Sequence, residues 1–240
     1  MKKVLKTAGL TTLIVLLFQV KVHAQEAGEV SLESSVGFCS RYVWRGLLFD
    51  DAPNIQPYIA VTWKNFTAAT WGSYATSGNY AEVDLFLSYC NEGFTLCVND
   101  YFTEDETDMS ISDYSEWRRD ETNHLIEAVL IYEPPFQNLP FQFTASSFVY
   151  GADLDDEGDQ NFSTYFEVKY PFSFHKHDCN VFIGGTTHDG FYANDPGIVN
   201  LGVSATKQFK ISESTQLPVS TSLTFNPSNR DVFFVFNISI

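Results

Sequence analysis

The sequence predicts an all-β fold, a closed antiparallel transmembrane β-barrel of about 12 strands. Segments in which apolar and polar residues alternate run along the chain and are separated by turn-forming residues. Long and short connections between these segments alternate, as in outer-membrane barrels. The last segment places Val232, Phe234, Phe236, Ile238 and Ile240 on one face. Such an apolar face suits bilayer lipid, whereas on a soluble edge strand it promotes aggregation.

Residues 1–24 have the pattern of a cleaved export signal. Three lysines at positions 2, 3 and 6 precede an apolar stretch from about Ala8 to Val20, and Ala24 supplies the small residue at the cleavage point. This stretch is short for a membrane-spanning helix. We therefore expect the barrel domain over residues 25–240 and localisation to the bacterial outer membrane, with outer-membrane lipid and the barrel-assembly machinery as partners.

The alternation predicts twelve strands in chain order. They cover residues 30–45, 55–64, 66–76, 81–91, 94–104, 123–133, 139–150, 161–171, 178–188, 197–209, 215–226 and 231–240. An even number of strands is typical of bacterial single-chain barrels.

The connections fall into two kinds. The odd-numbered ones are mostly long and cover residues 46–54, 77–80, 105–122, 151–160, 189–196 and 227–230. The even-numbered ones are mostly short turns, around Asn65 and at residues 92–93, 134–138, 172–177 and 210–214. In outer-membrane barrels long loops face outward and short turns face the periplasm, so both termini are expected in the periplasm.

The charge is strongly acidic. The chain carries a formal net charge of −16, and removing the four lysines of residues 1–24 leaves −20. Such a protein repels nucleic acid and attracts cations. The acids concentrate in two predicted loops, residues 104–121 and 153–159, where loose Ca²⁺ binding is one expectation and simple solvation the other. An EF-hand is excluded because Thr164 stands where its twelfth-position Glu belongs. We predict no dedicated metal site and no cofactor.

Charged residues within the predicted strands keep to the face opposite the apolar one. An Arg or Lys on the lipid face costs about 2–4 kcal/mol at the membrane midplane, so these residues are expected to line the lumen. The candidate pore-lining residues are Glu33, Arg41, Arg45, Glu82, Asp84, Glu127, Glu167 and Lys169. Two charged residues, Asp100 and Lys207, fall on the outward face instead.

Two functions are consistent with these interior charges. Five acids against three bases predict a narrow, weakly cation-preferring channel for small solutes. Alternatively, the charges pair into a network that closes the lumen, which makes the protein a structural or ligand- or ion-binding barrel. A twelve-stranded barrel is wide enough for either arrangement.

An enzyme is not expected. The Gly-x-Ser-x-Gly motif is absent, and the histidines closest to a catalytic pattern are His124, beside an acidic loop, and His188, next to Asp189. Such neighbours are common in loops. The pair His175 and His177 beside a turn is a weak metal signal, and ordinary solvated residues explain it better.

Two cysteines flank a predicted hairpin turn. With Gly93 and Phe94 as the two loop residues, Cys90 and Cys97 face each other across the hairpin. A disulfide between them is therefore possible in an oxidising export compartment.

Residues 39–58 read CSRYVWRGLLFDDAPNIQPY and resemble the opening motif of the TorF-type porin family. In that family a strand ending in Tyr-[Val/Phe]-[Trp/Phe]-Arg-Gly is followed by a short loop, a Pro and a Gln. The matching residues here are 42–46, Pro53 and Gln56, and residues 70–73 resemble the family's second motif. The resemblance implies an outer-membrane barrel that passes small solutes.

The motif residues also have a structural interpretation. Arg45 lies on the lumen face at the outer end of the first predicted strand, where it can pair with acids of neighbouring strands. Gly46 permits the turn into the first loop. Tyr42 and Trp44 fall on the lipid face and are expected in the outer aromatic belt.

Overall fold

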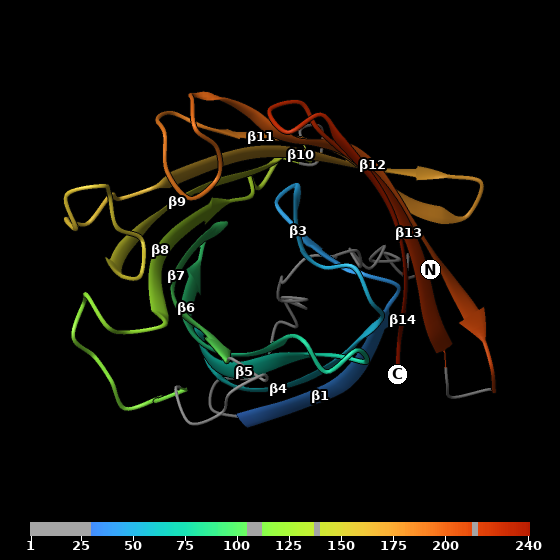
Figure 1. The fold of residues 1–240 in the computed structure, drawn as a ribbon. Helices are drawn as coiled ribbons and strands as arrows, with labels where there is room; N and C mark the ends of the chain where they lie inside the picture. The colour runs from blue at the N-terminus through green and yellow to red at the C-terminus, as the bar shows by residue number, and fades with distance from the viewer. Residues whose placement is uncertain (1–29, 105–111, 137–139, 213–215) are drawn as a thin grey trace.

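The computed structural model describes residues 30–104, 112–136, 140–212 and 216–240. In these residues twelve strands form one closed antiparallel barrel, and β1 closes onto β14 (Figure 1). Two further strands, β2 and β3, form a separate two-stranded sheet. The predicted fold class is confirmed. The proposed signal, residues 1–24, lies outside the described residues.

The barrel strands match the predicted ranges to within three residues at each end, except for the first. They are β1 (Val30–Cys39), β4 (Asn54–Trp63), β5 (Phe66–Ala75), β6 (Ala81–Asn91), β7 (Phe94–Glu104), β8 (His124–Tyr132), β9 (Gln142–Gly151), β10 (Thr164–Phe174), β11 (His177–Thr186), β12 (Gly197–Lys210), β13 (Gln216–Asn226) and β14 (Asp231–Ser239). The separate hairpin consists of β2 (Tyr42–Trp44) and β3 (Leu47–Asp50).

As predicted, the connections are mostly long at one end of the barrel and mostly short at the other, named here the long-loop end and the short-turn end. The short-turn end includes the tight hairpins β4–β5, β6–β7 and β10–β11. Several of these turns contain residues with positive φ, among them Lys64 (54°), Glu92 (49°) and Gly93 (85°). Two-residue hairpin loops need this backbone conformation because it matches the twist of the paired strands.

The outer face of the barrel is apolar. In β14, Val232, Phe234 and Phe236 are exposed on the outside, whereas Phe233 and Val235 are buried inside. The same alternation occurs on the other strands and leaves many large apolar side chains exposed outward. A closed twelve-stranded barrel with this surface is compatible with an outer-membrane protein. No helix in the described part of the chain has the length and apolar character needed to cross a membrane.

The first predicted strand is wrong beyond Cys39. The chain leaves the barrel wall there and forms the β2–β3 hairpin, which lies inside the ring of strands (Figure 1). Arg45 and Gly46 occupy the two-residue turn with φ of 50° and 80°, and Trp44 pairs with Leu47. Tyr42 and Trp44 are only 4% and 5% exposed in the interior, and neither joins an outer aromatic belt.

The inward turn of the chain leaves a short seam between β1 and β14. These strands pair at Gly37–Ser239, Phe38–Ile238 and Cys39–Asn237, and further main-chain hydrogen bonds join Val36 to Ile240 and Ser40 to Phe236. Residues 231–235 of β14 pair with β13 alone. Behind this half of β14, Val43 of the hairpin packs with Cys39, Phe233 and Val235 in a buried apolar cluster. The hairpin therefore packs from inside against the part of β14 that has no strand partner on its β1 side.

The predicted facing arrangement of Cys90 and Cys97 is not present. Asn91 pairs with Phe94, so the loop residues are Glu92 and Gly93, one position earlier than expected. Cys90 consequently lies opposite Thr95 and Cys97 opposite Ser88. All four cysteines, at positions 39, 90, 97 and 179, are free thiols.

Candidate functional site

Residues 42–50, named here the hairpin plug, fill the long-loop half of the lumen. The side chains of Tyr42, Trp44, Leu47 and Phe49 belong to one cluster with aromatic residues from the inner faces of the barrel strands. The tip contacts β13, where Asn226 donates a hydrogen bond to the carbonyl oxygen of Gly46 (3.0 Å). A Cβ on Gly46 would lie 1.9 Å from the carbonyl oxygen of Val199, so this position requires glycine.

Arg45 anchors the tip of the hairpin plug to β8. Its guanidinium forms an ion pair with Glu127, with Nη2 3.2 Å from Oε2, and also donates to the Tyr192 hydroxyl. The side chains of Arg45 and Glu127 are 11% and 0% exposed. The guanidinium carbon lies 4.3 Å from the Trp44 ring centroid and 4.5 Å from that of Tyr165. Delocalised charge and a planar shape suit Arg, rather than Lys, to this site.

Glu127 satisfies its remaining hydrogen-bonding capacity with tyrosines. Tyr101 donates to Oε2 (2.7 Å) and Tyr192 donates to Oε1 (3.3 Å). A buried carboxylate is tolerated only when it is paired and hydrogen-bonded. The arrangement around Glu127 meets both conditions, provided that the hairpin plug is in place.

A second anchor joins the base of the hairpin plug to β6. The Tyr42 hydroxyl donates to Oε1 of Glu82 (3.0 Å), and the Tyr80 hydroxyl donates to Oε2. Asp84, two residues further along the same inner face, is fully buried. The carboxylates of Glu82 and Asp84 therefore lie in the packed interior and do not face an open channel.

A second long connection also folds inward. Phe191 and Tyr192, between β11 and β12, meet the hairpin plug from the other side of the lumen. Trp44 lies 6.0 Å from Tyr192 and 6.3 Å from Phe191 between ring centroids, and Phe148 of β9 stacks on Tyr192 at 5.8 Å. The two connections together pack the long-loop half with aromatic side chains.

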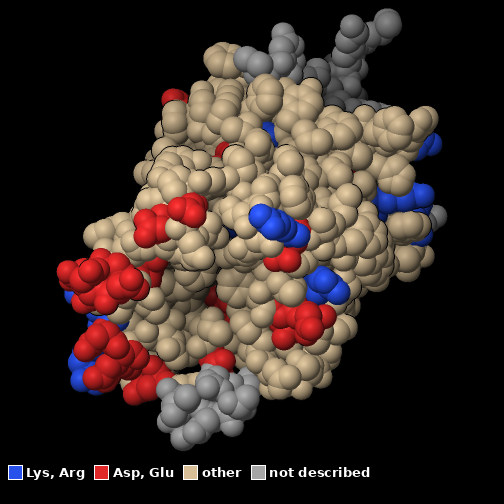
Figure 2. Space-filling model, turned by 45° about the horizontal axis from the view of Figure 1, so that its top comes forward, with Lys and Arg blue, Asp and Glu red and all other residues tan. Residues whose placement is uncertain are grey.

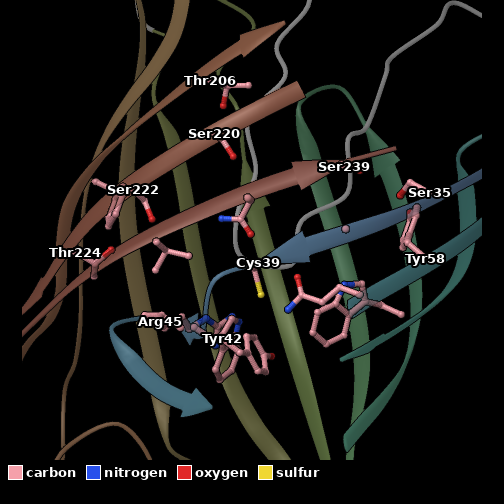
Figure 3. A pocket seen from close by; sticks show the side chains of 18 of the residues that line it. Ser35, Cys39, Tyr42, Arg45, Tyr58, Thr206, Ser220, Ser222, Thr224 and Ser239 are labelled. Atoms are coloured by element: carbon pink, nitrogen blue, oxygen red, sulfur yellow. The ribbon is translucent and has the colours of Figure 1, made fainter. Parts of the chain in front are cut away.

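A cavity of about 420 Å³ lies in the lumen between the hairpin plug and the short-turn end. Arg45 and Tyr42 lie at one side of it, and hydroxyl-bearing residues of β12 and β13 form a row on another (Figure 3). The lining extends to Glu33 near the start of β1 and to Gln216 at the start of β13. The plug thus separates this cavity from the long-loop end.

The eight predicted pore-lining residues all come from the interior face but divide into two groups. Five of them line the cavity, namely Glu33, Arg41, Arg45, Glu167 and Lys169. The other three, Glu82, Asp84 and Glu127, are buried around the hairpin plug. Lys169 lies 3.7 Å from Glu167, so this pair is close to neutral. The excess of acids over bases among the eight residues therefore does not reach the cavity, because three of the five acids are buried around the plug.

Sequence reasoning missed the aromatic residues that complete the site. Tyr101, Tyr165 and Tyr192 surround the Arg45 guanidinium, although none carries a charge that would have drawn attention. A usable signal was Arg45-Gly46, which suits a two-residue hairpin turn, flanked on both sides by apolar residues.

The outward charges at Asp100 and Lys207 are accounted for by their surroundings. Asp100 pairs with His124, whose Nδ1 lies 2.7 Å from its Oδ1 and whose Nε2 lies 2.9 Å from the carbonyl oxygen of Tyr114. Trp117 stacks on the imidazole at 3.9 Å, so the connection between β7 and β8 covers this pair. Lys207 lies near the end of β12 and contacts the ring of Phe209.

His188 does not pair with Asp189 in the way an acid–base pair at the rim would require. Its Nε2 lies 3.3 Å from the carbonyl oxygen of Asn161, and its Nδ1 lies 3.3 Å from the Thr187 hydroxyl. His124 is fully buried, with both ring nitrogens engaged by Asp100 and Tyr114.

The acidic connections lie at one side of the molecule. Figure 2 shows patches of Asp and Glu on the left, where Figure 1 places the connections β7–β8 and β9–β10. Hydrogen bonds from Arg118 lower the pKa of the half-buried Glu116 carboxyl to about 2. Asp155 accepts backbone hydrogen bonds from Glu157 and Asp159. No group of three metal-binding side chains occurs among the described residues, and loose Ca²⁺ binding stays a prediction.

No family model matches the chain, and no curated protein matches it. The resemblance of residues 39–58 to the TorF-type porins therefore stays a prediction based on the motif.

Proposed function

We propose that this protein is an outer-membrane channel for small solutes that the hairpin plug holds closed, with the long-loop end facing outward. The single observation that carries this proposal is the buried ion pair between Arg45 at the tip of the plug and Glu127 on the barrel wall. With Tyr42 bonded to Glu82 and the aromatic cluster packed around both anchors, the outer half of the lumen is filled.

The hairpin plug is attached to the barrel in a way that would let it move out of the lumen. Its two strands form a sheet of their own and do not pair with any barrel strand. Leaving the lumen would therefore break side-chain contacts, mainly at Arg45 and Tyr42, and would keep the main-chain hydrogen bonds between barrel strands. Because Tyr42 and Trp44 are buried in the aromatic cluster, this movement would also expose apolar surface, and the closed arrangement should be strongly favoured.

The proposed weak cation preference rests on the outer connections. The cavity itself holds Glu33 and Glu167 against Arg41, Arg45 and Lys169, and Arg45 is already paired. The acids of the connections β7–β8 and β9–β10 give a negative potential that concentrates cations near the outer entrance. This preference should weaken as salt screens the exposed acids.

The proposal is tested by conductance in planar bilayers. The wild-type protein is expected to give few or no unitary currents, whereas a variant with residues 42–50 replaced by a Gly-Ser linker of equal length is expected to conduct steadily. The control carries a Gly-Ser linker of equal length in place of residues 155–159, which are exposed, and should stay closed.

Two results would contradict this proposal. Steady wild-type currents equal to those of the variant without the plug would show that the hairpin does not close the lumen. A silent but folded variant without the plug would instead favour the second function, a structural or ligand-binding barrel with a closed lumen. That function is favoured by the same packed aromatic cluster.

A further inference from the structure

We propose that the cavity below the hairpin plug binds a small uncharged amphiphile, a molecule with an apolar ring or chain on one side and a hydroxyl group on the other. This inference goes beyond the proposed function because it requires the cavity and not the movement of the plug. The cavity volume, about 420 Å³, is in the usual range for small-molecule sites.

One wall of the cavity is apolar. Cys97 on β7 lies opposite Val129 on β8, and Ile131 follows on the same face of β8. The three form a buried apolar cluster, and all three line the cavity. Interior positions of a water-filled barrel are normally polar. An apolar patch here favours a ligand with a matching apolar side.

The wall formed by β13 and β14 is polar and uncharged. Ser220, Ser222 and Thr224 follow one another on the inner face of β13, as the row of hydroxyl groups in Figure 3 shows. Asn237 of β14 lies opposite Ser220 in the register. Hydroxyl and amide groups at these positions can bind a hydroxyl group of a ligand as donors or acceptors.

Two buried amide groups of the lining have an unpartnered atom. The Tyr101 hydroxyl donates to Glu127 and so can only accept from Asn99, which fixes the Asn99 amide nitrogen as the donor (2.9 Å). This leaves Asn99 Oδ1 as an acceptor with no partner among the described residues, and Asn237 Nδ2 is a donor with none. Asn99 and Asn237 are 7% and 9% exposed, and both line the cavity. Asn99 lies on β7 and Asn237 on β14, which are far apart in the order of the barrel strands, so a ligand hydroxyl can bond to either of these two atoms.

The charges of the lining argue against a charged ligand. Arg45 is paired with Glu127, and Lys169 lies 3.7 Å from Glu167. The other two charged residues of the lining, Glu33 and Arg41, have opposite signs. An ionic ligand would have to break an existing pair or leave its own charge without a matching partner.

The inference is tested by fluorine NMR of the full-length protein in lipid nanodiscs, with empty nanodiscs as the blank. The probes are para-fluorophenol, para-fluorobenzoate and fluoroglucose. We expect saturable binding of the phenol, much weaker binding of the charged benzoate, and much weaker binding of the sugar, which lacks an apolar side. Equal or tighter binding of either comparison compound would overturn the ligand class, and absence of saturable phenol binding would overturn the site.

A matched pair of variants locates the binding. Asn99→Leu removes the unpartnered acceptor and should weaken phenol binding about tenfold, the usual effect of one lost hydrogen bond. Asn180→Leu is the control, because Asn180 is also a buried interior residue but bonds to Ser204 outside the cavity lining. Equal affinities of the two variants would contradict the assignment.

A second measurement needs no variant and covers the case that Asn99→Leu does not fold. Bound phenol should slow the alkylation of Cys97 by N-ethylmaleimide, as followed by mass spectrometry of the wild-type protein. Cys179, which is not part of the cavity lining, is the internal control and should react at an unchanged rate. Unchanged labelling of both cysteines at saturating phenol would overturn the site. Because neither readout involves current, failure here is distinct from failure of the proposed channel.

Discussion

Arg45 combines several favourable contacts in one side chain. It forms an ion pair with Glu127, donates to Tyr192 and lies against the rings of Trp44 and Tyr165. Both members of the ion pair are buried, so each depends on the other for compensation of its lost hydration. Removing one member of such a pair is much more damaging than replacing both, because the remaining charge has no partner.

We therefore predict that Arg45→Ala lowers the free energy of unfolding by about 3–5 kcal/mol. Urea unfolding in lipid vesicles, followed by tryptophan fluorescence, measures this change. Arg41→Ala is the matched control, because Arg41 also lines the cavity but forms no ion pair within the described residues, and it should change stability by less than about 1 kcal/mol. The double variant Arg45→Met with Glu127→Leu should recover most of the loss. Equal effects of the two single alanine variants would refute a stabilising role for the pair.

At the scale of the element, the β6–β7 hairpin shows that moving the turn by one residue gives every residue a different partner across the two strands. The loop consists of Glu92 and Gly93, and Cys90 faces Thr95. The backbone N–H of Cys90 donates to Asn65 in the turn between β4 and β5, so it points away from β7 and the Cys90–Thr95 pair is not hydrogen-bonded. Side chains at such positions are the closest across an antiparallel sheet.

This register predicts that Thr95→Cys, combined with Cys97→Ser, forms a disulfide with Cys90 under mild oxidation. The wild-type protein should not link Cys90 to Cys97 under the same conditions, because these residues are diagonal and not opposite. Mass spectrometry of peptides from non-reduced protein distinguishes the two outcomes. Recovery of a Cys90–Cys97 peptide from the wild type, or no linkage in the variant, would mean that the turn lies elsewhere.

The strands of the barrel wall could be predicted from the sequence because alternation with period two is the direct consequence of one lipid-facing and one interior side. The hairpin plug could not. Tyr42 and Trp44 alternate with Val43 and Arg45 as a wall strand would. The pattern identifies two faces but does not show whether the apolar one meets lipid or other aromatic side chains. In the structure, the positive φ of Arg45 and Gly46 forms the turn that separates the hairpin from a wall strand.

Only part of the candidate site could be predicted from the sequence. The interior location of Arg45 and Glu127 followed from charge, since neither suits lipid, but their pairing joins residues 82 positions apart. Tyr101 and Tyr192 gain their roles only because two separate connections fold into the same lumen. Contacts of this kind depend on where loops return in space, which local alternation does not encode.

At the scale of the whole molecule, the outer surface is apolar and suits lipid, whereas the lumen is polar and suits water. Large apolar side chains such as Leu87, Leu96 and Phe234 project outward with 58–64% exposure, while the interior holds hydroxyl groups, amides and paired charges. This distribution is compatible with an outer-membrane barrel that hydrocarbon surrounds. The cost of a charge on the outside should then depend on depth, which a barrel in water would not show.

The depth dependence can be measured with two equally exposed positions. Leu87 is 63% exposed near the centre of β6, and Phe174 is 61% exposed at the short-turn end of β10. We predict that Leu87→Arg destabilises the protein folded in lipid vesicles by about 2–4 kcal/mol, because the guanidinium lies near the membrane midplane. Phe174→Arg should cost no more than about 1 kcal/mol, since its charge reaches the interface. Equal and small effects at both positions in urea titrations would mean that lipid does not surround this wall, and the proposed channel would fail with it.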